Sequence, residues 1–378
     1  MRATPAGKVE RSSESPVFAD EGANRVAKLP TLSSEVEMAG RLRETGLKVF
    51  ATCPPSYTAT PRIYLRDVLE VARWSEAAGC EGILIYTDNG LVDPWLIAQE
   101  MITHTEQLCP LVAVQPVYMH PYAVAKVVAS LGFLHGRRIY LNMVAGGFKN
   151  DLEALNDPTP HDERYARLVE YTTLIMDLLK GPGPVTLDGR YYRVANLRMT
   201  PPLEPKLLPG VFVSGSSDAG MAAARELGAL AVRYPKPVAE YEAAPPPDAA
   251  ALGIRIGIIA REDSHDAWTV ARQRFPDDRR GQLTHQLAMK VSDSEWHKQL
   301  SKLGETAAGE EQPYWMVPFE NYKTFCPYLV GSYDRVADEV ARYVGVGYKT
   351  IILDVPASPE ELEHIGVVCE RAAERVTL

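Results

Sequence analysis

Short runs of apolar residues alternate with stretches of helical spacing from Leu47 onward. Eight apolar runs are typical of buried strands, at 47–52, 82–86, 111–119, 139–144, 211–215, 230–234, 254–260 and 350–355. Stretches of helical spacing separate them, at 64–78, 93–103, 122–134, 162–180 and 218–227. Apolar strands joined by helices predict a parallel sheet that is covered on both faces. Eight such strands in 378 residues favour a closed (β/α)8 TIM barrel with insertions, and a doubly wound sheet is the alternative.

Three segments depart from this alternation. Residues 1–45 lack a clear period, and we expect a flexible leader with one short helix near 33–42. Residues 46–378 are then one barrel domain, interrupted by a hairpin-like excursion at 181–202 and a long polar insertion at 281–328. Long loops in compact domains are usually lids or binding loops. We expect both insertions at the carboxyl ends of the strands, where barrels carry their sites.

Composition narrows the class of protein. Hydrophobic residues make up 46% and charged residues 24%, as in ordinary globular proteins, and the net charge of −9 argues against nucleic-acid binding. The sequence has no apolar run long enough to span a membrane and no apolar secretory segment. Five widely spaced cysteines without a CxxC pair favour buried thiols in the cytoplasm. We expect no metal site, because neither HExxH, HxH nor clustered carboxylates occur.

The turn after the fifth predicted strand is the first candidate site. Ser214, Gly215, Ser216 and Ser217 separate this strand from a helix. Small residues allow a ligand to approach the backbone, and free N–H groups at a helix start bind anions such as phosphate. The alternative is that Ser216 or Ser217 only caps the helix.

Further polar residues stand at the ends of predicted elements. His161 and Tyr165 share one helix face and can both donate to a phosphate, although simple packing is the alternative. Asn142 interrupts a buried strand, so its amide needs partners, either a ligand ring or neighbouring backbone. Arg255 lies within the seventh predicted strand, where it either faces the site or pairs with a buried carboxylate. Weaker candidates at other strand ends are Thr87, Asp88, Gln115 and Tyr234.

Several of these segments, in this order, resemble the bacterial luciferase-like flavin monooxygenases, and most nearly the alkanesulfonate monooxygenase branch. The similar segments are RIYLNMVAGG (138–147), HDERYARLVEY (161–171), VFVSGSSDAG (211–220), GIRIGIIARED (253–263) and LVGSYDRVADEV (329–340). The last of these resembles the helix before the final strand of the family. The resemblance covers about residues 47–372 and implies an eight-stranded barrel with insertions.

The resemblance also implies a cofactor and a reaction. Family members take reduced FMN (FMNH2) from a separate NAD(P)H:flavin reductase, and O2 forms a flavin C4a-(hydro)peroxide that oxidises the substrate. Carried over, Ser216, Ser217, His161 and Tyr165 hold the FMN phosphate, with Ser214 and Gly215 in the same turn. Asn142 and Gln115 face the isoalloxazine ring, and Thr87 or Asp88 lines its pocket. We expect a homodimer or homotetramer.

The sequence departs from the sulfonate branch around the substrate. Cys53, Leu91, Tyr234 and Gly257 replace residues of that branch's substrate pocket, and only Arg255 remains of its polar set. We therefore expect a substrate other than a simple alkanesulfonate, a small molecule of specialised metabolism or a carrier-bound one. Arg255, taken as the catalytic residue, then binds a substrate anion or the flavin peroxide, in space that Gly257 leaves beside it. Alternatives are an F420-dependent oxidoreductase and a non-catalytic flavin-binding barrel.

Overall fold

The computed structural model describes residues 40–57, 60–146, 149–181, 183–246, 251–283, 285 and 312–376. Most of the predicted leader and the middle of the insertion at 281–328 lie outside these residues. At the start of the described chain, helix α2 covers Arg41–Glu44.

Eight parallel strands close into a barrel, as the hydrophobic pattern predicts. They are β1 (Lys48–Thr52), β2 (Gly82–Ile85), β3 (Cys109–Val114), β4 (Tyr140–Val144), β7 (Val211–Ser214), β8 (Leu230–Arg233), β9 (Leu252–Arg261) and β12 (Tyr348–Leu353). Each pairs in parallel with the next around the ring, and the pairing of β8 with β9 closes it. Burial on both faces accounts for the unbroken apolar runs.

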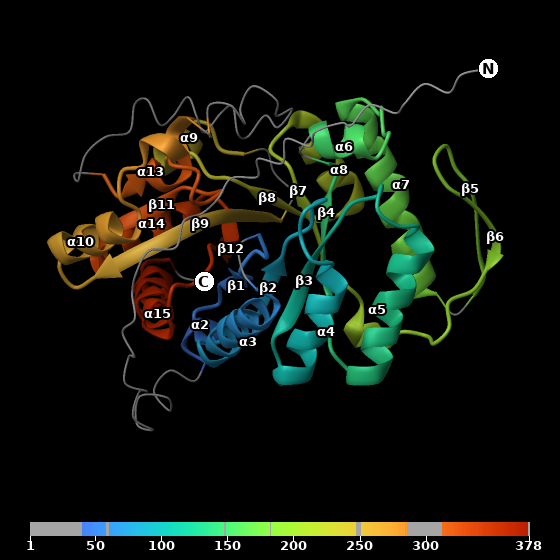
Figure 1. Cartoon of the computed structure of the whole chain (residues 1–378), viewed down its shortest axis with the longest axis horizontal. Helices are drawn as coiled ribbons and strands as arrows, with labels where there is room; N and C mark the ends of the chain where they lie inside the picture. The colour runs from blue at the N-terminus through green and yellow to red at the C-terminus, as the bar shows by residue number, and fades with distance from the viewer. Residues whose placement is uncertain are drawn as a thin grey trace, which may run out of the picture.

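Helices surround the barrel between these strands (Figure 1). The longer ones are α3 (Pro61–Ala77), α4 (Pro94–His104), α5 (Pro121–His135), α7 (His161–Lys180), α8 (Asp218–Leu227), α10 (Ser264–Arg274), α14 (Tyr333–Gly345) and α15 (Pro359–Arg375). Shorter ones are α6 (Lys149–Ala154), η1 (Pro205–Leu207), α9 (Val238–Ala243) and α13 (Val317–Glu320). Proline in the first turn starts α3, α4, α5 and α15, where the missing N–H costs nothing. Among the helices that the structure describes, none combines the length and apolar character needed to cross a membrane.

The barrel interior is packed at its centre. Seven strands each contribute one buried side chain to this cluster, namely Phe50, Leu84, Leu111, Tyr140, Phe212, Val232 and Ile352. The rings of Phe50, Tyr140 and Phe212 meet edge to face at 5.2–5.8 Å between centroids. A layer of this kind blocks the barrel axis, so any ligand has to bind at one of its ends.

The third predicted strand is shorter than expected. It ends at Val114 rather than Met119, because Pro116 follows Gln115 and a proline cannot donate a ladder hydrogen bond. Gln115 therefore stands at the carboxyl end of β3, in the loop that leads to α5.

The segment resembling a helix at 329–340 is only partly helical. Residues Tyr328–Ser332 form strand β11, which pairs in parallel with Gly257–Arg261 of β9, outside the closed ring. A second short strand, β10 (Tyr314–Trp315), pairs antiparallel with β11. The apolar run of β11 covers the end of β9 that projects beyond the barrel, and α14 starts only at Tyr333.

The excursion at 181–202 connects the end of α7 to the start of β7, at the amino side of the barrel and contrary to expectation. It forms an antiparallel hairpin, β5 (Val185–Asp188) with β6 (Arg193–Leu197), between the end of α7 and β7. The hairpin stands beside α7 at the outer edge of the molecule (Figure 1). The Glu170 carboxylate on α7 accepts backbone N–H bonds from residues 190–192, which fastens the hairpin turn.

Candidate functional site

A cavity of about 170 Å³ opens at the carboxyl ends of the barrel strands. Leu84, Val232 and Ile352 of the central layer form its floor. Thirteen of the residues singled out from the sequence line it: Thr87, Asp88, Leu91, Gln115, Asn142, His161, Tyr165, Ser214, Gly215, Ser216, Ser217, Tyr234 and Arg255. Residues scattered over the chain therefore meet at one place, the end of the barrel where such sites occur.

Two helix N-termini meet at one end of this cavity. Helix α7 begins at His161 and α8 begins at Asp218, and the first turn of α7 and the residues just before α8 both line the wall. Unpaired N–H groups and the positive dipole end make a helix N-terminus attractive to anions. This end of the cavity therefore presents the kind of groups that attract an anion.

Ser216 and Ser217 have different roles in the turn. Ser217 is the N-cap of α8, and its Oγ accepts the Gly220 N–H at 3.2 Å. Ser216 Oγ is buried and has no hydrogen-bond partner within the described chain. A buried hydroxyl without a partner is costly, so Ser216 is the serine whose geometry fits a bound oxyanion.

Tyr165 reaches this turn because the turn lacks side chains. A Cβ on Gly215 would lie 2.3 Å from Tyr165 Oη, and one on Gly220 would lie 3.2 Å from its ring. Tyr165 is 8% exposed, and the His161 ring packs against it edge to face at 5.3 Å. His161 Nδ1 also lies 2.7 Å from Asp162 Oδ1.

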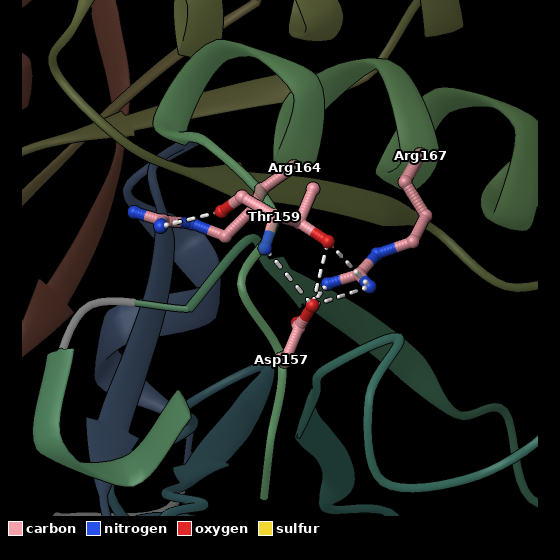
Figure 2. Close-up of polar contacts among 4 residues, drawn as sticks. All are labelled: Asp157, Thr159, Arg164 and Arg167. Carbon is pink, nitrogen blue, oxygen red and sulfur yellow. Dashed lines mark hydrogen bonds and ion pairs between the residues drawn. The ribbon is translucent and has the colours of Figure 1, made fainter. Parts of the chain in front are cut away.

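Arg164, on the same helix face, was missed in the sequence. It is 5% exposed and lines the cavity between His161 and Tyr165 along the chain. Figure 2 shows its Nη1 donating to the Thr159 carbonyl oxygen, at 3.1 Å. The i, i+3 spacing from His161 was a signal that could have found it.

Asp157 fastens the loop that holds Arg164. Its carboxylate accepts hydrogen bonds from Thr159 Oγ1 at 2.6 Å and from Arg167 Nη2 at 2.6 Å (Figure 2). Burial alone would raise the pKa of Asp157, but the hydrogen bonds from Arg167 and Thr159 outweigh burial and lower it. Asp157 is therefore ionised and joins α7 to the loop before it.

The middle of the cavity wall carries two amides. Asn142 Oδ1 accepts from Ser214 Oγ at 2.8 Å, a bond between strands β4 and β7. Gln115 Nε2 donates to Tyr118 Oη at 3.3 Å, and Tyr118 Oη donates to Asn89 Oδ1 at 2.8 Å. Asn142 and Gln115 are 5% and 6% exposed, so their orientations are fixed by these neighbours. A planar polar ring between them would meet preset amide groups.

The loop after β2 forms part of the cavity mouth. Asp88 Oδ1 accepts the Gly90 N–H at 2.7 Å, and its Oδ2 accepts from Tyr57 Oη. Burial and the hydrogen bond to Asp88 raise the pKa of Tyr57, so this phenol remains protonated. Thr87 and Leu91 complete this side of the wall.

Arg255 borders the opposite end of the cavity, among aromatic rings. Its Nη1 donates to Tyr234 Oη at 3.2 Å, and its Cζ lies 4.7 Å from the ring centroid of Tyr86. Arg255 is 3% exposed, and its Nη2 lies 3.7 Å from Asp354 Oδ1. The ring of Phe325, from the insertion after β9, packs near Tyr86 and also lines the cavity. Both alternatives for Arg255 therefore hold in part, since it faces the cavity and lies near a carboxylate that is partly buried.

Two expected substrate-pocket residues do not line the cavity. Cys53 is 1% exposed, packs in the core, and burial raises the pKa of its thiol to about 12. Gly257 leaves no open space, because a Cβ there would come 2.3 Å from the ring of Tyr328 on β11. The sequence interpretation failed here because the neighbour of Gly257 comes from a strand outside the barrel.

Comparison with known proteins agrees with this geometry. The model of the luciferase-like monooxygenase family matches residues 45–350. The 4-(γ-L-glutamylamino)butanoyl-[BtrI acyl-carrier protein] monooxygenase of Niallia circulans is 33% identical over 313 residues, covering 81% of this chain and 91% of the relative.

Two solved structures share the fold at low sequence identity. A long-chain alkane monooxygenase superposes with a TM-score of 0.65 at 18% identity, covering 86% of this chain and 90% of that one. The EDTA monooxygenase of Chelativorans sp. BNC1 gives 0.61 at 16%, covering 87% and 93%. The resemblance inferred from the sequence motifs is confirmed, and the chain belongs to the luciferase-like monooxygenase family, as a flavin-dependent monooxygenase.

Proposed function

We propose that this protein is the oxygenase of a two-component system that receives reduced FMN from a separate NAD(P)H:flavin reductase. The observation that carries the proposal is the end of the cavity where Ser216 Oγ is buried without a partner in the described chain, beside two helix N-termini. Reduced FMN supplies two electrons to dioxygen, of which one oxygen atom enters the substrate and the other leaves as water.

The residues of this chain bind and orient the cofactor. Ser216, Arg164, Tyr165 and His161 hold the phosphate, and Ser217 keeps the helix start in place through its cap. The amides of Asn142 and Gln115 face the ring from the ends of β4 and β3. The packed barrel centre closes the cavity on one side, and a site that excludes water protects reactive intermediates.

Arg255 acts at the substrate end in this proposal. A guanidinium that is 3% exposed and borders the cavity can bind a carboxylate or a carbonyl oxygen through charge-assisted hydrogen bonds. The ring of Tyr86, with Phe325 packed against it, offers apolar contacts beside it. This end suits a substrate with an apolar stem and a polar oxygen.

We propose a substrate whose acyl group is bound to a carrier protein. Support comes from the relative in Niallia circulans, whose name gives 4-(γ-L-glutamylamino)butanoyl-[BtrI acyl-carrier protein] as its substrate. An open mouth is needed for a tethered group, and the predicted insertion at 281–328 contributes Phe325 to the cavity wall. A free small acid is the competing substrate class. The oligomeric state and the cytoplasmic location stay predictions from the sequence.

Anaerobic titration tests the cofactor assignment. We expect reduced FMN to bind more tightly than either oxidised FMN or reduced F420. Ser216→Ala should weaken the binding of reduced FMN. Tighter binding of reduced F420, together with no oxygen consumption in the presence of reduced FMN, would replace the monooxygenase assignment by hydride transfer.

The substrate class needs a second experiment. The protein, a flavin reductase, NAD(P)H and FMN are incubated with 4-(γ-L-glutamylamino)butanoyl carrier protein or with the free acid, under isotopically labelled dioxygen. Label in the carrier-bound product alone supports the proposal, and label only in the free acid rejects it.

A further inference from the structure

The guanidinium of Arg255 is buried with incomplete partners. Nη1 donates to Tyr234 Oη, whereas Nε and Nη2 have no hydrogen-bond acceptor in the part of the chain that the structure describes. Its nearest carboxylate oxygen, Asp354 Oδ1, is 3.7 Å from Nη2, which is too far for a hydrogen bond. Nε and Nη2 form the side edge of the guanidinium, the edge that matches a carboxylate with two parallel bonds.

Asp354 stays at that distance because another residue holds it. Tyr328 Oη donates to Asp354 Oδ2 at 2.7 Å, and Tyr328 is 1% exposed. Asp354 follows directly after the last residue of β12, Leu353, so it stands at the carboxyl end of the barrel beside Arg255. The carboxylate is shared between a phenol on one side and a distant guanidinium on the other.

Gly257 is what allows this arrangement. Gly257 and Tyr328 are register partners on β9 and β11, and the tyrosine ring occupies the volume where a side chain at 257 would stand. Any larger residue there would push the ring away and break its hydrogen bond to Asp354. The glycine, the tyrosine and the carboxylate therefore form one unit next to Arg255.

We propose that Tyr328 is a positioning residue for the substrate end of the cavity: through Asp354 it keeps Arg255 only partly paired, so that the guanidinium is available to a carboxylate of the substrate. The inference rests on the proposed function in taking this cavity as the substrate site. Without the tyrosine hydroxyl, Asp354 rotates onto the side edge of Arg255 and competes with the ligand. Without the Asp354 charge, there is no competitor, and an entering anion becomes the counter-charge of a buried cation.

The two substitutions thus have opposite expected effects on the binding of an anion. The probe is hexanoate, with hexanamide as its neutral counterpart, and the dissociation constant is measured by ligand-observed NMR. Tyr328→Phe should weaken hexanoate by about tenfold, as the loss of a bond to a charged group would. Asp354→Asn should tighten it, and hexanamide should change little in either variant.

The double variant Tyr328→Phe/Asp354→Asn isolates the pathway of the effect. If Tyr328 acts through Asp354, Tyr328→Phe should not change the dissociation constant of hexanoate further once Asp354 has been replaced by Asn. Tyr140→Phe is the matched control, because Tyr140 is also buried and donates to a carboxylate, Glu81 Oε1 at 2.5 Å, at the amino end of the barrel. This control should leave hexanoate binding as in the wild type.

Each outcome decides between positioning and a purely structural role. Equal weakening by Tyr328→Phe in both backgrounds, or weaker hexanoate binding in Asp354→Asn, overturns the proposal. Reduced FMN is titrated into the same variants under anaerobic conditions, and its affinity should not change. If the two substitutions do not have opposite effects on hexanoate binding while reduced FMN still binds, only this inference is rejected. If reduced FMN does not bind the wild type, the proposed function is rejected and the hexanoate result still holds.

Discussion

The hydroxyl of Tyr165 lies where the side chain of residue 215 would stand, since a Cβ on Gly215 would come 2.3 Å from Tyr165 Oη. The glycine therefore positions the tyrosine against the turn that precedes α8. Gly215→Ala should displace Tyr165 and weaken the binding of reduced FMN by about 1–3 kcal/mol, the cost of losing hydrogen bonds to a charged group. Gly345→Ala is the control, because a Cβ there meets nothing within 4 Å. Equal FMN affinity in Gly215→Ala and wild type would remove Tyr165 from the phosphate site.

Substitutions of the two neighbouring serines should have different effects on FMN binding and on stability. Ser216→Ala removes a buried hydroxyl without a partner in the described residues, so we expect weaker reduced FMN and unchanged or slightly higher stability. Ser217→Ala removes the N-cap of α8, so the free energy of unfolding should fall by about 0.5–2 kcal/mol. Denaturant unfolding and anaerobic titration measure the two quantities. The reverse assignment of effects would mean that Ser217 is the phosphate ligand.

Replacing Arg255 by Lys tests its place in the substrate site. Lys keeps the charge beside Asp354 but loses the planar edge and the bond to Tyr234, so substrate oxidation should fall while the melting temperature stays near that of the wild type. Arg255→Met should instead lower stability by about 1–3 kcal/mol, because it removes the bond to Tyr234 and the positive charge 3.7 Å from Asp354 Oδ1. Normal turnover in Arg255→Lys would exclude Arg255 from the reaction.

Asp157 should give the fold an acid-sensitive contribution. Its pKa is lowered in the folded protein, so the bond to Arg167 stabilises the fold above the ordinary aspartate pKa of about 3.9 and is lost as the pH falls through the lower folded value. Asp157→Asn should therefore cost about 1.5–3 kcal/mol at neutral pH, and the difference from the wild type should narrow in acid below about pH 4. Denaturant unfolding across this range checks it, and a gap that is constant with pH would contradict it.

Much of the fold was predictable because burial on both faces leaves long apolar runs. All eight barrel strands and helices α3, α4, α5, α7 and α8 follow this pattern, with ends shifted by a few residues, whereas α10 and α15 were not predicted. Strand β11 was missed because residues 329–332 were assigned to the helix that follows, although the N-cap Ser332 marks the start of α14. The hairpin of β5 and β6 was expected at the wrong end, since loop length alone does not say which end of the barrel a connection occupies.

The site was predictable where its residues belong to one local segment. Ser214–Ser217 and His161–Tyr165 each show their chemistry within a few positions, and both line the cavity. The division of labour between Ser216 and Ser217 was not predictable, because it depends on which hydroxyl caps α8. The relation of Gly257 to Tyr328 depends on a strand pair outside the barrel, and nothing in the sequence around Gly257 indicates it.

The central claim, a cavity that binds reduced FMN for reaction with dioxygen, is tested most directly by stopped-flow mixing. Protein loaded with reduced FMN under anaerobic conditions is mixed with oxygenated buffer, and the appearance of oxidised FMN is followed by absorbance. Because the site excludes water, oxidised FMN should form from bound reduced FMN in a separate phase that is slower than its formation from free reduced FMN. Ser216→Ala should lose that phase, because it weakens the binding of reduced FMN. A trace that coincides with that of free reduced FMN, at protein concentrations well above the FMN concentration, would contradict the account.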